Sequence, residues 1–130
     1  MGDVMILIFG GAYQGKLVYT LEHYGLTEND VFHCSDENAT MPENKMIING
    51  IDRWVLALIR AGRSVQDEVC KLIENMHNAI IICNDISCGV VPVDEELRMW
   101  REAVGVALTA LASASKEVIR LFCGIPTKIK

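Results

Sequence analysis

A glycine-rich segment near the start of the chain has the residue types and spacing of an anion-binding loop. Residues 10–17 read GGAYQGKL and fit the pattern G-x-x-x-x-G-K. Glycines let a backbone curl so that successive N–H groups face an anion at the start of a helix, and the lysine adds a positive charge for the outer phosphates of a nucleotide. The segment therefore predicts a phosphate site. Its expected members are Gly10, Gly11, Ala12, Tyr13, Gln14, Gly15, Lys16 and Leu17.

The last position of the segment departs from the full phosphate-binding pattern. Ser or Thr normally stands there, and its hydroxyl binds Mg²⁺. Leu17 has no hydroxyl, so this contact to the metal is lost. The alternative interpretation is a glycine turn that keeps the shape of the loop without its ligand. We favour phosphate binding, because the loop follows a buried-type strand and opens a helix.

Apolar strands and amphipathic helices alternate along the chain and are expected to position this loop. The run from Val4 to Phe9 is typical of a strand covered on both faces, and helical spacing after the loop continues to Gly25. Further strands are expected at 30–34, 46–48, 79–83 and 117–123, with helices at 54–62, at 64–76 and after Pro92. This order predicts one α/β domain over 1–130, with three layers and a mainly parallel central sheet of about five strands. Ligands of such sheets bind at the carboxyl ends of the strands.

Composition narrows the class of protein. The 130 residues are 51% hydrophobic with a net charge of −5, so a nucleic acid is a poor candidate partner and a homo-oligomer is expected to cover part of the apolar surface. Apolar runs such as Ala103 to Ala112 are shorter than the roughly 18 residues that cross a bilayer. No basic segment precedes the first of them, so we expect a cytoplasmic protein without a membrane span. The five cysteines form no C-x-x-C pair, and we interpret them as reduced thiols rather than as a metal site.

Four segments match the pattern of one known family in order and spacing. They are ILIFGGA with Gly15-Lys16 at the start, CNDISCGVVP at 83–92, Trp100-Arg101-Glu102 with Gly105, and GIPTK at 124–128. Together they resemble the adenosylcobinamide kinase/adenosylcobinamide-phosphate guanylyltransferase family of cobalamin biosynthesis. The resemblance covers the first 25 residues, the stretch around Trp54 and nearly everything from Ile80 onward. It implies a P-loop NTPase-like fold, ATP or GTP as the nucleotide, a cobinamide as the corrinoid partner, and a trimer.

Two departures from the family pattern concern its chemistry. Asn49 stands where the family has an acidic residue near Mg²⁺, so with Leu17 both usual protein contacts to the metal are missing. Asp52 and Asp85 either compensate or occupy solvated positions at a helix start and in a loop. The basic helix that carries the family's guanylylated histidine has no counterpart, because Ser35 to Lys45 is short and acidic. His33 lies nearest to that gap, and we interpret it as structural.

The remaining aromatic and histidine residues receive simpler interpretations. Trp54 and Trp100 fall on apolar helical faces and are expected in the core or a subunit contact rather than against a base. Tyr13 either stacks on a ligand or fills space within the loop. His23 and His77 are expected at the surface or at caps.

Three hypotheses for function follow. The favoured one is a nucleotide-binding relative with impaired or altered catalysis, and the Mg²⁺ requirement is left open. The second is an active cobinamide kinase without guanylyl transfer, in which Lys16 holds the phosphates and Asp85 contacts a metal or the acceptor hydroxyl. The third is a structural or regulatory oligomer that keeps only the fold.

Overall fold

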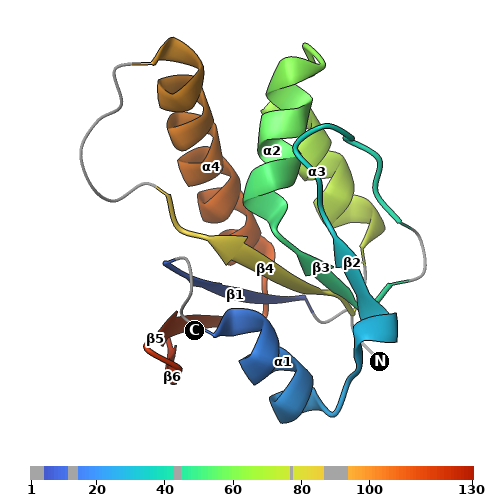
Figure 1. Ribbon diagram of the computed structural model, residues 1–130, viewed down its shortest axis with the longest axis vertical. Coiled ribbons are helices and arrows are strands. Elements are labelled where there is room, and N and C mark those ends of the chain that lie inside the picture. The colour runs from blue at the N-terminus through green and yellow to red at the C-terminus, as the bar shows by residue number, and fades with distance from the viewer. Residues whose placement is uncertain (1–4, 12–14, 43–44, 77, 87–93) are drawn as a thin grey trace.

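Six strands form one sheet in the part of the chain that the computed structural model describes, which is residues 5–11, 15–42, 45–76, 78–86 and 94–130 (Figure 1). The strands are β1 (Ile6–Gly10), β2 (Val31–His33), β3 (Ile47–Asn49), β4 (Ile80–Asn84), β5 (Glu117–Phe122) and β6 (Ile125–Lys128). Their order is β2-β3-β4-β1-β5-β6, and every neighbouring pair is parallel except β5 and β6. The predicted α/β fold with a mainly parallel sheet is confirmed.

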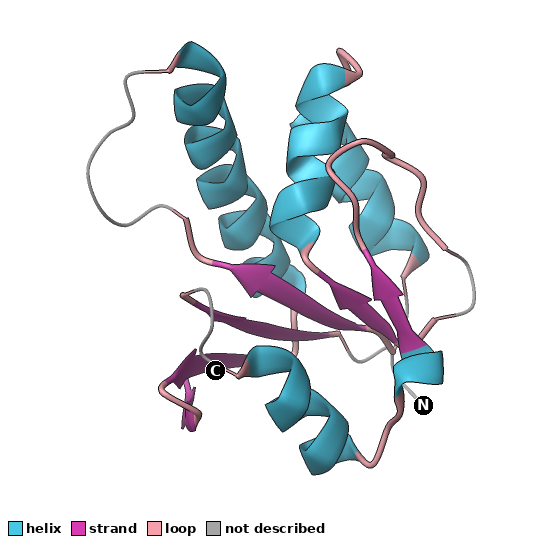
Figure 2. Ribbon diagram, in the orientation of Figure 1, coloured by secondary structure: helices cyan, strands magenta, loops and turns pink. Residues whose placement is uncertain are grey.

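Helices cover both faces of this sheet. They are α1 (Lys16–Tyr24), α2 (Ile51–Arg60), α3 (Val65–Asn75) and α4 (Glu95–Ala114), with a 3₁₀ turn at Glu28–Asp30. Figure 2 shows α1 on one side of the sheet and α2, α3 and α4 on the other, so the three predicted layers are present. None of the helices in the described ranges is long and apolar enough to span a membrane.

Successive side chains of each strand point to opposite faces of the sheet, so the core consists of two clusters. Leu7 and Ile81 point to the side of α2, α3 and α4, where the larger cluster includes Trp54 and Leu111. Ile8 points to the other side, where α1 packs. Because β1 and β4 are buried on both faces, they read in the sequence as continuous apolar runs.

β6 was not predicted from the sequence, so a sheet of about five strands was expected. Cys123 and Gly124 have φ values of 50° and 75°, and Phe122 pairs with Ile125 across them. This is the two-residue turn that joins antiparallel strands with the correct twist. Pro126 lacks an N–H, and β6 tolerates it because β6 is an edge strand.

The strand order indicates where a ligand site is expected in this sheet. From β1 the chain crosses one face through α1 to reach β2, whereas from β4 it crosses the other face through α4 to reach β5. The connections that leave the neighbouring strands β1 and β4 therefore diverge at their carboxyl ends. Such a divergence opens the crevice in which open α/β sheets bind their ligands.

Gly10 ends β1 at a close approach to β5. A Cβ placed on Gly10 would overlap the carbonyl oxygen of Leu121, and φ at Gly10 is 159°. The Gly10 carbonyl also accepts a hydrogen bond of 2.8 Å from the N–H of Asp85. The start of the glycine-rich segment is thus fixed between β4 and β5.

We predict that Gly10→Ala destabilises the protein by about 1 to 3 kcal/mol, because the added methyl group collides with the backbone of β5. Gly105→Ala is the matched control. No atom lies near a Cβ at Gly105 within α4, so this change should stabilise the fold by about 0.5 to 1 kcal/mol. Denaturant unfolding of both variants measures the difference, and equal stabilities would contradict the close approach.

Candidate functional site

A cavity of about 460 Å³ lies at the carboxyl ends of the parallel strands. It is bordered by the start of α1, the ends of β2, β3 and β4, and the first turn of α2. Its lining residues are Gly15, Lys16, Leu17, Val18, His33, Cys34, Asn49, Gly50, Arg53 and Asn84. Of the predicted phosphate-loop residues, Gly15, Lys16 and Leu17 line the cavity, whereas Gly10 and Gly11 do not. Asn49, where a Mg²⁺ ligand was sought in the sequence, lines it as well.

Lys16 is the first residue of α1 and is buried, with 7% of its surface exposed. Gly15 precedes it at φ 82°, in the left-handed region that glycine adopts readily. The Lys16 Nζ donates a hydrogen bond of 2.7 Å to the carbonyl oxygen of Gly11. The ammonium group is thus held against the glycine-rich segment, at the N-terminus of a helix.

Burial lowers the pKa of Lys16 from its ordinary 10.5, because desolvation disfavours the charged form. The nearby Asp52 carboxylate acts in the opposite direction and raises the pKa of Lys16. An anion in the cavity would stabilise the ammonium further. The site is therefore electrostatically prepared for a ligand with negative charge.

Asp52 is buried in the first turn of α2, with 3% of its surface exposed. Its Oδ1 accepts the N–H of Asn84 at 3.2 Å, and its Oδ2 accepts the Asn84 side-chain amide at 3.4 Å. Its carbonyl oxygen accepts the Trp100 indole N–H at 2.7 Å. The solvated helix-start role that the sequence left open for Asp52 is wrong, since the carboxylate faces the end of β4 instead of water.

His33 and Asn49 pair in register on β2 and β3, so their side chains lie next to each other. The Asn49 amide nitrogen lies 3.1 Å from Nδ1 of His33, and Nε2 of His33 lies 3.1 Å from a Glu28 carboxylate oxygen. Because an amide nitrogen only donates, Nδ1 is the acceptor and the Nε2–H donates to Glu28. Both ring nitrogens are engaged, which agrees with the structural interpretation of His33.

The residues present do not fit the usual magnesium site of a phosphate loop. Leu17 lines the cavity with an aliphatic side chain, and Asn49 offers a neutral amide where a carboxylate would supply negative charge, with its amide nitrogen bonded to His33. The Asp52 carboxylate is occupied by Asn84. Within the described ranges, no three His, Cys, Asp or Glu side chains are grouped so that they could hold a metal ion.

Cys34 also lines the cavity, but its chemistry is that of an inert thiol. Burial and the nearby charge of Asp52 raise its pKa to about 12. The thiolate is the nucleophilic and metal-binding form of cysteine. Cys34 therefore stays protonated at neutral pH and packs as a small apolar side chain.

The other predicted site residues either do not line this cavity or lie outside the described residues. Asp85 follows β4 and is tied to Gly10 through its N–H, but it is not among the lining residues. Ala12, Tyr13 and Gln14 lie outside the described residues, as does His77. The expectations for these residues remain predictions.

Both tryptophans pack as the sequence indicated. Trp54 is 3% exposed within the larger core cluster, and its indole N–H donates to the Ala39 carbonyl at 3.0 Å. Trp100 packs against the same cluster and donates to Asp52. His23 lies on the surface of α1, where it stacks on Tyr19.

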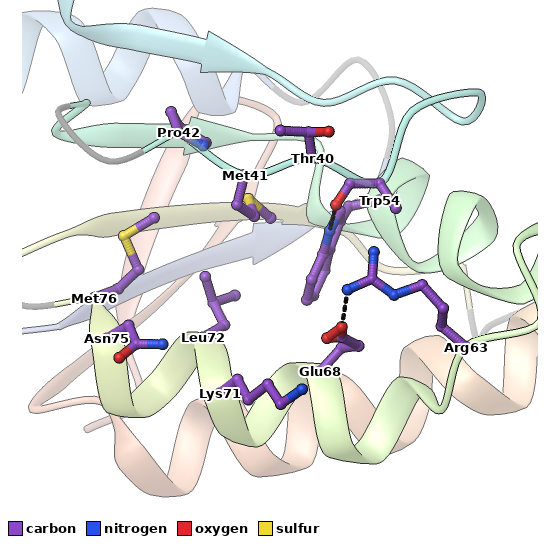
Figure 3. Close-up of a pocket in the computed structure, with 11 residues that line it drawn as sticks. Thr40, Met41, Pro42, Trp54, Arg63, Glu68, Lys71, Leu72, Asn75 and Met76 are labelled. Carbon is purple, nitrogen blue, oxygen red and sulfur yellow. Dashed lines mark hydrogen bonds and ion pairs between the residues drawn. The ribbon is translucent and has the colours of Figure 1, made fainter.

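A second cavity of about 650 Å³ lies between the segment at 39–42, α2 and α3 (Figure 3). Figure 3 shows an Arg63–Glu68 ion pair at one side of it, with Leu72 and Met76 toward the other. None of its lining residues belongs to a strand. Since Arg63 is paired with a carboxylate, this cavity is less suited to a phosphate than the one at the strand ends.

Sequence reasoning missed the burial of Asp52 and the place of Arg53 in the cavity. The available signal was the position of both residues directly after a short buried strand and Gly50, because side chains there face the carboxyl edge of the sheet. Asn84 was noted only as part of a motif. Its contact with Asp52 joins residues that are distant in the chain and that no local pattern connects.

A family model described as cobinamide kinase / cobinamide phosphate guanyltransferase matches residues 20–129 of the chain. The matched range begins within α1, so the glycine-rich segment and Lys16 precede it. It includes the ends of β2, β3 and β4 that border the cavity. No curated protein matches the chain.

We predict that Asp52→Ala lowers the free energy of unfolding by about 1 to 3 kcal/mol, because the partly buried Asn84 donors lose their acceptor. Asp52→Asn keeps one oxygen for the Asn84 N–H and should cost less. Chemical denaturation of the two variants provides the comparison. An Ala variant as stable as the parent would show that the carboxylate does not hold the end of β4.

Proposed function

Because the chain belongs to the cobinamide kinase / cobinamide phosphate guanyltransferase family, whose fold is of the P-loop type, we propose that it binds the phosphates of ATP or GTP in cobalamin biosynthesis. Lys16 and the backbone of the glycine-rich segment hold the phosphates. The observation that carries this proposal is the buried Lys16 ammonium at the start of α1, turned onto the Gly11 carbonyl beside an open cavity.

The physical argument combines three favourable features at one place. The N-terminus of α1 attracts negative charge, because the first N–H groups of a helix have no partner within the helix itself. Lys16 supplies a positive charge that is already partly desolvated, so an incoming phosphate need not strip water from it. The cavity opens at the carboxyl ends of the strands, where the sheet connections diverge.

A second candidate function is phosphoryl transfer from the nucleotide to a cobinamide hydroxyl. The position of Asp85 supports it, since its backbone is tied to Gly10 at the same edge of the sheet. Asp85 would then contact the acceptor hydroxyl. Guanylyl transfer through His33 is not part of the proposal, because both nitrogens of its ring are already bonded.

Exposed apolar side chains support a homo-oligomer. Large examples lie on α4, at Leu97, Met99 and Val106, and on the β5–β6 hairpin, at Phe122 and Ile125. Burying such side chains between subunits is favourable. We predict that light scattering at micromolar concentration returns a mass above that of one chain, and a single-chain mass would contradict this.

We predict that Lys16→Ala weakens ATP or GTP binding by about 1.5 to 3 kcal/mol, the cost of removing a charged hydrogen-bond partner. Lys71→Ala is the matched control, because Lys71 lines the second cavity. Titration calorimetry measures both. Loss of binding in the Lys71 variant instead would place the nucleotide between α2 and α3.

The same proposal predicts how the affinity for ATP changes with pH. Phosphate binding requires the ammonium form, and the pKa of Lys16 lies below 10.5 in the free protein. Affinity for ATP should therefore fall as the pH rises through that lowered pKa, before an ordinary lysine would titrate. In the Lys16→Ala variant this fall should be absent.

A further inference from the structure

Arg53 is a second cation in the cavity that contains Lys16. It lies in the first turn of α2 and is exposed. A Cβ placed on Gly50 would lie 3.8 Å from Cδ of Arg53, so the aliphatic part of the side chain runs back over Gly50. This path directs the side chain toward the carboxyl end of β3 and the cavity.

The guanidinium group of Arg53 has no hydrogen-bond or ion-pair partner among the residues that the structure describes. Two other arginines, in contrast, are paired. Arg60 contacts Glu96 and Asp36, and Arg63 contacts Glu68. Arg53 therefore keeps all its donors available for a ligand in the cavity.

The charge of the cavity is positive although the chain as a whole is acidic. The ten lining residues include Lys16 and Arg53 but no Asp or Glu, in a chain with a net charge of −5. Two carboxylates that adjoin the lining residues are already committed, Asp52 to Asn84 and Glu28 to His33. An anionic ligand thus meets two cations and no opposing carboxylate in the lining.

We propose that Arg53 binds the outer phosphate of the nucleotide that Lys16 holds, and that its charge replaces the charge Mg²⁺ supplies in related sites. This inference rests on the proposed function and extends it to a metal-independent mode of phosphate binding. The ligand class is a di- or triphosphate with a free terminal phosphate.

Arginine chemistry suits this role. Its planar guanidinium presents several donors and forms paired hydrogen bonds with two phosphate oxygens. It stays charged across the whole working range of pH. The two positions that would contact a metal are Leu17 and Asn49, and both line the same cavity as Arg53. The loss of metal contacts and the presence of the free arginine are therefore found at one site.

The first experiment is titration calorimetry with ATP, with GTP and with inorganic tripolyphosphate, all in EDTA. Arg53→Gln should weaken binding of each ligand that the parent protein binds by about tenfold or more, the effect of one charged hydrogen-bond contact. Arg53→Lys keeps the positive charge but loses the paired donors of the guanidinium, so its affinity should lie between those of the parent protein and the Gln variant. Arg98→Gln is the control, since Arg98 lies in an early turn of α4 and does not line the cavity. Unfolding midpoints should be equal for all three variants, because Arg53 and Arg98 are both exposed.

The second experiment removes Arg53 and restores the two side chains that would contact a metal. The parent protein should bind ATP equally well in EDTA and in Mg²⁺. Leu17→Ser, Asn49→Asp and Arg53→Gln combined provide a hydroxyl and a carboxylate without the arginine, and binding by this variant should require Mg²⁺. Strong magnesium dependence of the parent protein would overturn the proposal.

The outcomes separate this inference from the proposed function. If Lys16→Ala weakens ATP binding and Arg53→Gln does not, the nucleotide site remains and the role of Arg53 is wrong. If tripolyphosphate binds through Arg53 while neither ATP nor GTP binds, the anion site remains and the nucleotide function is wrong. Failure of all three ligands to bind the parent protein rejects both.

Discussion

The carboxylate of Asp52 is the contact on which the arrangement of the site depends. It is buried at the start of α2, accepts both the backbone and the side-chain N–H of Asn84, and lies close enough to Lys16 to support the lysine's charge. Its carbonyl oxygen receives the indole of Trp100 from α4. Removing a carboxylate from water is costly unless such partners satisfy it. The same residue thus connects α2 and β4, which border the crevice, with α4 behind them.

The electrostatic pattern of the site follows from where its acidic groups are used. Asp52 faces inward to Asn84, and Glu28 binds the outer nitrogen of His33. The cavity itself is lined by cations, amides and apolar groups. Carboxylates in this region therefore order the protein scaffold, whereas the ligand-facing surface is left positive. This division explains how an acidic chain presents a site for anions without a clustered basic surface.

Much of the fold could be predicted because it depends on local patterns. Buried strands such as β1 and β4 read as apolar runs, and Ser64 caps α3 through the Asp67 N–H. The β5–β6 hairpin was missed because its turn relies on a positive φ at Cys123, a residue type that gives little signal for it. The glycine-rich segment predicts that Lys16 lies at the start of a helix, because the pattern is local. The Asp52–Asn84 pair depends instead on the packing of α2 against β4, which no local pattern in the sequence indicates.

The strand order also has a consequence for biogenesis. β1 is synthesised before the other strands, yet its neighbours in the sheet are β4 and β5, which lie far along the chain from it. Until those strands are synthesised, its run of apolar residues has no hydrogen-bonded neighbours. Non-local pairing of this kind slows folding, and an exposed apolar strand is prone to associate with other chains. A chain in which β4 and β5 have not yet been made therefore exposes the unpaired edges of β1, and this apolar segment is then prone to aggregate.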